Sequence, residues 1–135
     1  MIPKSSVADE AKFYIQKKLM ETAQKNNIRI LFAVESGSRA WGFPSINSDY
    51  DVRFVYVRNR EDYLSVKPHR DVIEMDLLDD SFLGLPLDLN GWDVRKALQL
   101  AVKSNAVLIE WLQSPIKYIT DDEMVTDLFN VSSKF

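Results

Sequence analysis

The stretch ESGSRAWGFPSINSDYDVRFVYV, residues Glu35 to Val57, decides the fold of this 135-residue chain. Its last part, DYDVRFVYV, alternates between polar and apolar side chains and predicts a half-buried β-strand. The run before the stretch, IRILFAVE (Ile28 to Glu35), is β-branched and almost wholly apolar, which predicts a buried strand. The sequence therefore predicts two strands joined by a loop, and that loop contains two of the chain's four glycines.

The loop begins with Gly37 and Ser38, which have the composition of a phosphate-binding turn. Glycine lets a ligand approach the backbone closely, and the N–H groups of such a turn attract phosphate oxygens. Ser38 adds a hydroxyl donor, and Arg39 adds a charged fork. A tight turn that needs glycine for its geometry alone is the alternative, and Gly-Ser by itself favours that alternative.

Asp49 and Asp51 stand two residues apart at the start of the second strand, so both side chains point to the same face. Two neighbouring carboxylates repel each other unless a positive charge lies between them. Oxygen ligands of this kind suit Mg²⁺ or Mn²⁺. The alternative is an Asp-rich turn, which Asp-x-Asp alone favours. The residues expected on the opposite face, packed against helices, are Tyr50, Val52, Phe54 and Tyr56.

The combination is more specific than either part. A strand, Gly37-Ser38, ten intervening residues, Asp49-x-Asp51 and a second strand bring a phosphate cradle and two carboxylates to one edge of a sheet. This pattern resembles the signature of the polymerase-β-type nucleotidyltransferase superfamily. The segments LDLNGWDVRKAL and NAVLIEWLQSPIKY also resemble the nucleotidyltransferases linked to RNA repair, the RlaP or YcgL-like group. The resemblance covers roughly Glu35 to Tyr118.

The superfamily adds a third carboxylate from a neighbouring strand, and the resemblance favours Asp88 for this role. Asp88 is flanked by Leu87 and Leu89, so its side chain points away from the face that the leucines bury. A charged residue inside a short apolar strand needs a reason, and metal binding is one. Asp76, which shares a strand face with Glu74, is the reserve candidate.

The resemblance implies a metal-dependent nucleotidyltransferase that moves a nucleoside monophosphate from a triphosphate such as ATP to a hydroxyl and releases pyrophosphate. Catalytic and metal-binding roles fall on Asp49, Asp51 and Asp88, and nucleotide binding falls on Gly37, Ser38 and Arg39. The acceptor suggested by the group is an RNA end. Alternatives are a partner protein that receives AMP, a small molecule such as an aminoglycoside, and a non-catalytic, antitoxin-like regulator on the same fold.

Composition excludes several other classes of site. The chain has no cysteine and one histidine, His69, so neither disulfides nor a zinc site is expected. A net charge of −3 and a pI near 5.2 disfavour a strongly basic nucleic-acid-coating module. No apolar run spans a membrane and no signal peptide is evident, so a cytoplasmic location is the expectation.

The remaining patterns predict one α+β domain, a small mixed β-sheet covered by helices, as in the polymerase-β-like fold. A first helix runs from Ser5 or Ser6 to about Asn26, and Pro115 ends the later helices. Residues 1–115 are expected to form the catalytic domain. Residues 116–135 are expected to form a helical segment that begins a further helical region. Further strands, a short helix and later helices are expected at 70–78, 85–92, 59–66, 92–102, 106–113 and 121–129. Arg95 and Lys96 are placed near the metal edge, where they would meet phosphates or form a solvated face.

Overall fold

The structure, a computed structural model, describes residues 7, 9–37, 49–75, 78–79, 86–121, 123, 126–128 and 130. In this part of the chain, helices and strands alternate in the order expected for an α+β fold. The elements are α1 (Asp9–Asn26), β1 (Ile28–Glu35), β2 (Tyr50–Arg58), α2 (Arg60–Tyr63), β3 (Val72–Glu74), β4 (Leu78–Asp79), β5 (Pro86–Asp93), α3 (Val94–Val102), α4 (Ala106–Gln113) and β6 (Lys117–Ile119).

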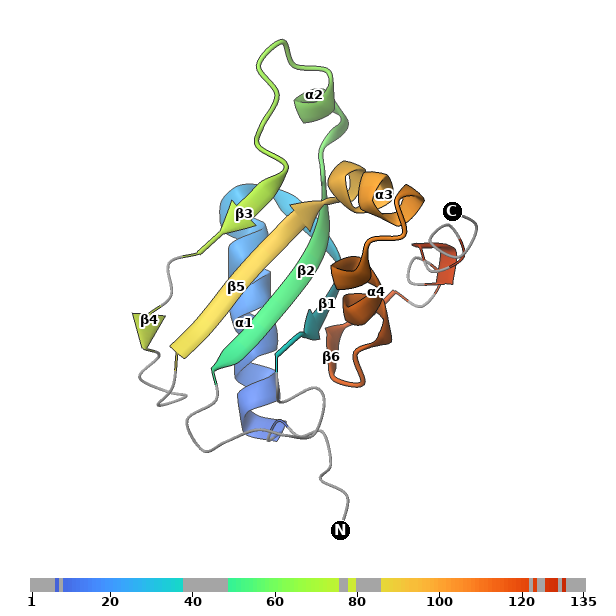
Figure 1. The fold of residues 1–135 in the computed structure, drawn as a ribbon. Coiled ribbons are helices and arrows are strands. Elements are labelled where there is room, and N and C mark those ends of the chain that lie inside the picture. Colours follow the sequence, from blue (N-terminus) through green and yellow to red (C-terminus); the bar gives the residue numbers. More distant parts are fainter. Residues whose placement is uncertain are drawn as a thin grey trace.

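The strands form one mixed sheet in the order β3-β5-β2-β1-β6, and β4 also pairs with β5 (Figure 1). The two central neighbours, β2 and β5, are parallel, whereas the other pairs are antiparallel. Because a parallel pair starts at the same edge of the sheet, the first residues of β2 and β5 lie side by side. The predicted mixed sheet is confirmed.

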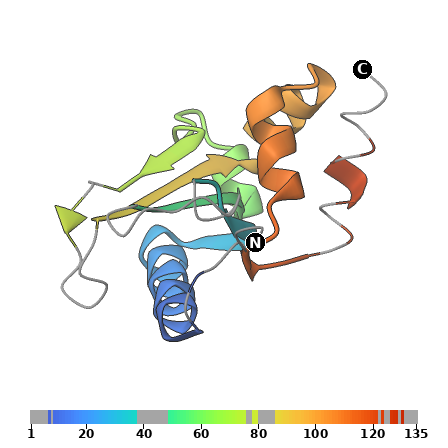
Figure 2. The same ribbon diagram turned by 60° about the horizontal axis from the view of Figure 1, so that its bottom comes forward.

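Helices cover both faces of the sheet. Figure 2 shows α1 against one face and α3 and α4 against part of the other. The α1 face holds one core cluster, formed by Ala11, Ile15, Leu19, Ala33, Tyr50, Val52, Phe54, Tyr56, Ile73, Leu87, Leu89, Ile116 and Tyr118. The second cluster joins the sheet to α3 and α4 and is formed by Leu31, Phe32, Val34, Val55, Ala97, Ala101, Leu108, Trp111, Leu112 and Leu128. The expected packing of the apolar β2 side chains against a helix is confirmed.

The local sequence explains how the elements begin and end. After α1, Asn27 adopts a left-handed backbone (φ 52°), which ends the helix at the predicted Asn pair. Asp93 caps α3 by accepting the N–H of Arg95, and Asn105 caps α4 by accepting the N–H of Leu108. A bulge between Ile30 and Phe32 shifts the β1 register, so the consecutive residues Leu31 and Phe32 both lie in the second core cluster.

Most predicted elements are confirmed, but two regions differ from the prediction. The strand expected at 70–78 is shorter, because only Val72–Glu74 and Leu78–Asp79 pair with β5. The strand β6 was not predicted, and it lies beyond Pro115, where it pairs with β1. Of the helix expected at 121–129, the described residues Glu123 and 126–128 are helical. Ser5 and Ser6 lie outside the described residues, and the division at residue 115 stays a prediction.

A search of the described residues for membrane spans found no helix both long and apolar enough to cross a bilayer.

Candidate active site

Two aspartates meet at the shared starting edge of β2 and β5. Asp51 is the register partner of Asp88 across this parallel pair. Both side chains are half-buried, whereas their neighbours Val52, Leu87 and Leu89 are buried on the α1 face. Strand alternation therefore places both carboxyls on the face opposite α1, as the flanking leucines predicted for Asp88. The structure brings the predicted third carboxylate next to Asp51.

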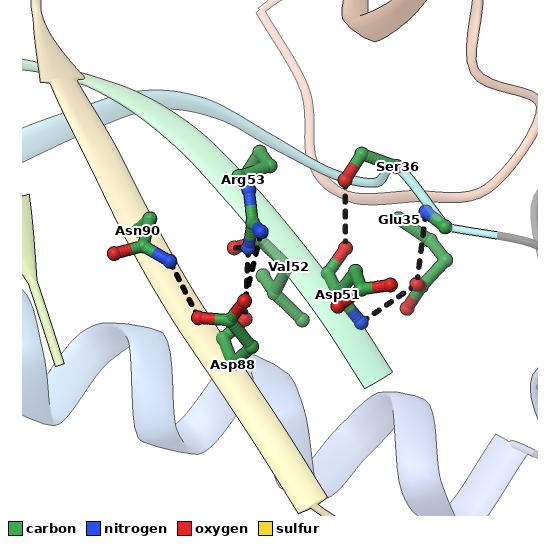
Figure 3. Close-up of polar contacts among 8 residues, drawn as sticks. Glu35, Ser36, Asp51, Val52, Arg53, Asp88 and Asn90 are labelled. Atoms are coloured by element: carbon green, nitrogen blue, oxygen red, sulfur yellow. Dashed lines mark hydrogen bonds and ion pairs between the residues drawn. The ribbon is translucent and has the colours of Figure 1, made fainter. Parts of the chain in front are cut away.

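Asp88 is held by two neighbours on the same face (Figure 3). A guanidinium nitrogen of Arg53 lies 2.8 Å from the Asp88 Oδ2 atom, and a second one donates to the Asp88 carbonyl at 3.2 Å. The side-chain amide of Asn90 donates to the other carboxylate oxygen. Arg53 thus supplies the positive charge that the neighbouring carboxylates require.

Gly37 lies directly against the Asp51 carboxyl. The preceding Ser36 N–H donates to the Asp51 carbonyl at 2.8 Å, which ties the end of β1 to the start of β2. A Cβ atom added to Gly37 would lie 2.2 Å from the Asp51 Oδ2 atom, far inside van der Waals contact. Any larger residue here would push the Asp51 carboxylate aside. The predicted juxtaposition of the Gly-Ser turn with an aspartate is therefore confirmed for Gly37 and Asp51.

Glu35, which the sequence analysis did not single out, organises this junction from the buried side. One carboxyl oxygen accepts the N–H of Asp51 at 2.8 Å and that of Gly37 at 3.4 Å. The other accepts the hydroxyl of Tyr118, a β6 residue, at 2.8 Å. The Glu35 side chain is fully buried. The sequence feature that could have indicated this role is a carboxylate at the end of an apolar strand, immediately before the Gly-Ser turn.

Burial raises the pKa of the Glu35 and Asp51 carboxyls. It raises the pKa of Glu35 to about 7, although the hydrogen bonds from Tyr118 and from the Asp51 N–H oppose the rise. Burial also raises the pKa of Asp51, where the Arg53 guanidinium lowers it and the charges of Asp88 and Asp49 raise it further. Burial thus favours the protonated form of both groups, even with Arg53 present.

The other predicted residues have different outcomes. Asp49 is half-buried immediately before β2 and repels Asp51 electrostatically. Ser38, Arg39 and the reserve candidate Asp76 lie outside the described residues.

The placement of Arg95 and Lys96 near the metal edge is wrong. Both belong to α3, which follows the far end of β5 (Figure 1). Asp88 and Asp93 stand five residues apart on the strand, a separation of about 16 Å. Arg95 instead contacts Asp93 at 3.4 Å and lies over the Tyr63 ring.

A family model described as the RNA repair pathway DNA polymerase beta family, RlaP, matches residues 11–135. The chain belongs to this family. The YcgL protein of Bacillus subtilis is 52% identical over 101 residues, which are 75% of this chain and 36% of YcgL. The chain therefore spans about a third of this relative's length.

A solved structure resembles this RlaP-family chain in its fold. It is a nucleotidyltransferase-like protein from Exiguobacterium sibiricum, with a TM-score of 0.50 and 14% identity. The match covers 90% of this chain and 38% of the solved one. At this level of identity the likeness extends to the fold alone, and it confirms the nucleotidyltransferase-like architecture.

The residues of this RlaP-family site suit a divalent cation in their chemistry. Asp49, Asp51 and Asp88 offer only oxygen ligands, which Mg²⁺ and Mn²⁺ prefer. Burial raises the pKa of Asp51, and the charges of Asp88 and Asp49 add to the rise. Within the described ranges, no three acidic, histidine or cysteine side chains are grouped closely enough to hold a metal ion. Asp88 bonds Arg53 and Asn90 instead.

Proposed function

We propose that this chain transfers a nucleoside monophosphate from a nucleoside triphosphate to a hydroxyl acceptor, with release of pyrophosphate. Family membership and the nucleotidyltransferase-like fold support the general reaction class. The observation that carries the proposal is the junction of Gly37, Asp51 and Asp88, where a glycine turn meets two register-paired carboxyls. In the reaction, the acceptor oxygen bonds to the α-phosphorus while the bond from the α-phosphorus to the β-phosphate oxygen breaks.

The family resemblance and the junction of Gly37, Asp51 and Asp88 support the following roles. The backbone N–H groups that follow Gly37, with Ser38 and Arg39, would hold the triphosphate. Asp49, Asp51 and Asp88 would hold Mg²⁺ or Mn²⁺, which would supply positive charge against the triphosphate and lower the pKa of the acceptor hydroxyl. Asp88 would exchange its Arg53 contact for the cation. Arg53 would then be free to contact a phosphate oxygen, since its guanidinium lies beside the same carboxylates.

An RNA end is the acceptor class that best fits the family description, RNA repair. Because the acceptor need not be nucleic acid, the test uses both RNA and protein acceptors. The chain is incubated with Mg²⁺ and each triphosphate labelled at its α-phosphate, and transfer to RNA 3′ ends, RNA 5′ ends or candidate proteins is measured.

The decisive variants are Asp49→Asn and Asp51→Asn, with Asp9→Asn, an exposed aspartate of α1, as the matched control. Loss of a metal-binding carboxylate is expected to reduce transfer by at least about 10²-fold. The control is expected to retain the rate of the unaltered chain. Unchanged transfer by Asp51→Asn would refute the mechanism, and absence of transfer to every acceptor would favour a binding-only protein.

A further inference from the structure

A pocket of about 390 Å³ continues from the candidate active site along the face of the sheet opposite α1, called the open face below. Arg53 and Asn90, the two side chains that hold Asp88, form its near wall. Val72 and Glu74 of β3 and Glu110 of α4 lie farther out. The volume falls in the range of small-ligand sites and accommodates a nucleoside. A ligand in this pocket would lie directly beside the carboxylates.

One wall of the pocket is aromatic and fixed in place. Trp92 of β5 stacks on Trp111 of α4, with ring centroids 3.8 Å apart and ring planes 26° from parallel. Trp111 is buried in the core cluster that joins α3 and α4 to the sheet, and Val107 extends the same wall. A rigid apolar wall of this kind suits a flat ring system, because little conformational freedom is lost on binding.

The charged groups in the outer part of the pocket are hydrogen-bond acceptors. Glu74 and Glu110 are exposed carboxylates, which accept hydrogen bonds and donate none when ionised. The Asn90 amide nitrogen donates to Asp88, and its oxygen points away from Asp88 (Figure 3). Three hydrogen bonds from Arg53 are directed to Asp88 and to the Val52 carbonyl. The two glutamates therefore favour a ligand that brings its own N–H donors.

We infer that this pocket binds a nucleobase that carries an exocyclic amino group: adenine, guanine or cytosine. Each of these bases presents an NH₂ donor that a carboxylate can accept. Uracil presents one ring N–H between two carbonyl oxygens, and these oxygens are repelled by carboxylates. The inference rests on the proposed function. The base would belong to the donor triphosphate or to the terminal nucleotide of an RNA acceptor.

Binding is measured by equilibrium dialysis with Mg²⁺ and α,β-methylene analogues of ATP, GTP, CTP and UTP, which cannot be transferred. Inorganic triphosphate reports the contribution of the phosphates alone. The analogues of ATP, GTP and CTP are expected to bind at least about tenfold more tightly than that of UTP. In a second arm, short RNAs that end in adenosine or uridine at the 3′ hydroxyl replace the triphosphates. A preference in either arm supports the pocket and identifies the source of the base.

The variant that tests the location carries Glu74→Gln and Glu110→Gln. Its control carries Glu21→Gln and Glu61→Gln, two exposed glutamates far from the pocket, so both proteins lose the same charge. The ratio of affinities between the ATP and UTP analogues is compared, because it cancels general effects of charge on phosphate binding. In the pocket variant, the affinities for the ATP and UTP analogues are expected to differ by less than about threefold. The control is expected to preserve the original ratio.

Several results would overturn the inference. Equal binding of all four analogues, with no preference among the RNAs, would contradict a base pocket yet leave the proposed function intact, because that function depends on transfer and on Asp51. An unchanged ratio in the Glu74→Gln, Glu110→Gln variant, or no binding of any probe, would also contradict it. A base preference in a chain that transfers no nucleotide would refute the proposed function and support the pocket.

Discussion

The two faces of the β2–β5 pair differ in content although the same two strands build both. The α1 face carries Tyr50, Val52, Phe54, Leu87 and Leu89, all of which are buried. The opposite face carries Asp51, Arg53, Asp88 and Asn90, all of which are half-buried. Because side chains alternate along a strand, one residue step separates a stabilising position from a candidate functional one. Substitutions on the two faces are therefore expected to have different consequences.

Two glycines show the same contrast. A Cβ atom at Gly37 would lie 2.2 Å from the Asp51 carboxylate, whereas one at Gly91 would lie 2.1 Å from the buried Phe54 ring. At both positions an added Cβ atom would displace its neighbour. The first neighbour is a half-buried carboxylate, and the second is a fully buried ring.

The largest expected effect concerns Glu35, a carboxyl buried on the α1 side of the site. Because burial raises its pKa from 4.5 to about 7, folding favours the protonated form. Its contribution to stability is complete below about pH 4.5, where both the folded and the unfolded chain are protonated, and is lost as the pH rises through about 7. The free energy of unfolding of the metal-free chain is expected to fall by up to about 3 kcal/mol over this range.

The measurement is denaturant unfolding at a series of pH values, for the unaltered chain and for Glu35→Gln. Glutamine has the neutral charge of the protonated acid, so the difference between the two curves isolates the titration of Glu35. Glu61→Gln, at an exposed position, is the control and should run parallel to the unaltered chain. A constant difference between Glu35→Gln and the unaltered chain across this range would contradict the raised pKa.

Next in size is Gly37→Ala on the open face. The added methyl group displaces the Asp51 carboxylate, and nucleotide transfer is expected to fall by about 10²-fold. The free energy of unfolding is expected to change by less than about 1 kcal/mol, because the half-buried Asp51 side chain can rotate. Transfer assays and denaturant unfolding of the same preparations check the two expectations. A normal transfer rate would show that this contact has no role in catalysis.

Gly91→Ala is expected to have the opposite profile. The methyl group meets the ring of Phe54, which is fully buried, so the unfolding free energy should fall by about 2 kcal/mol. Transfer per folded molecule should stay within about twofold of the unaltered chain. Replacing the ring by the smaller leucine side chain, with Phe54→Leu added to Gly91→Ala, should restore part of the unfolding free energy. Loss of transfer without loss of stability would contradict the assignment of a stabilising role to the α1 face and a functional role to the opposite face.

Much of this division could be predicted from local sequence. The alternation in DYDVRFVYV and in PLDLNGW places Asp51 and Asp88 opposite their apolar neighbours without knowledge of the tertiary structure. The Gly-Ser and Asp-x-Asp spacing also predicted that Gly37 and Asp51 would meet. These features depend on a period of two and on short sequence separations, and a single sequence contains both.

Features that depend on the pairing of strands far apart in the sequence were harder to predict. That Asp51 faces Asp88 follows from the parallel register of β2 and β5, and their 37-residue separation leaves that register unspecified by local pattern. The role of Glu35 depends on Tyr118 from β6, a three-residue strand too short for a periodic signal. Arg95 was misplaced because the direction of β5 relative to the site was not known.

The smallest expected effect concerns Arg53, whose ion pair with Asp88 supplies the positive charge of the open face. Arg53→Met keeps an unbranched stem and removes the charge, so the pKa of Asp51 should rise further, since Arg53 lowers it. At pH 7 without metal, stability is expected to fall by about 1 kcal/mol, the upper range for a partly exposed pair. Saturating Mg²⁺ should narrow this difference, because the cation replaces the lost charge beside the same carboxylates. Unfolding is compared in EDTA and in Mg²⁺, with Arg29→Met, an exposed residue of β1, as the control. An equal difference in both buffers would show that Arg53 and the cation do not serve the same carboxylates.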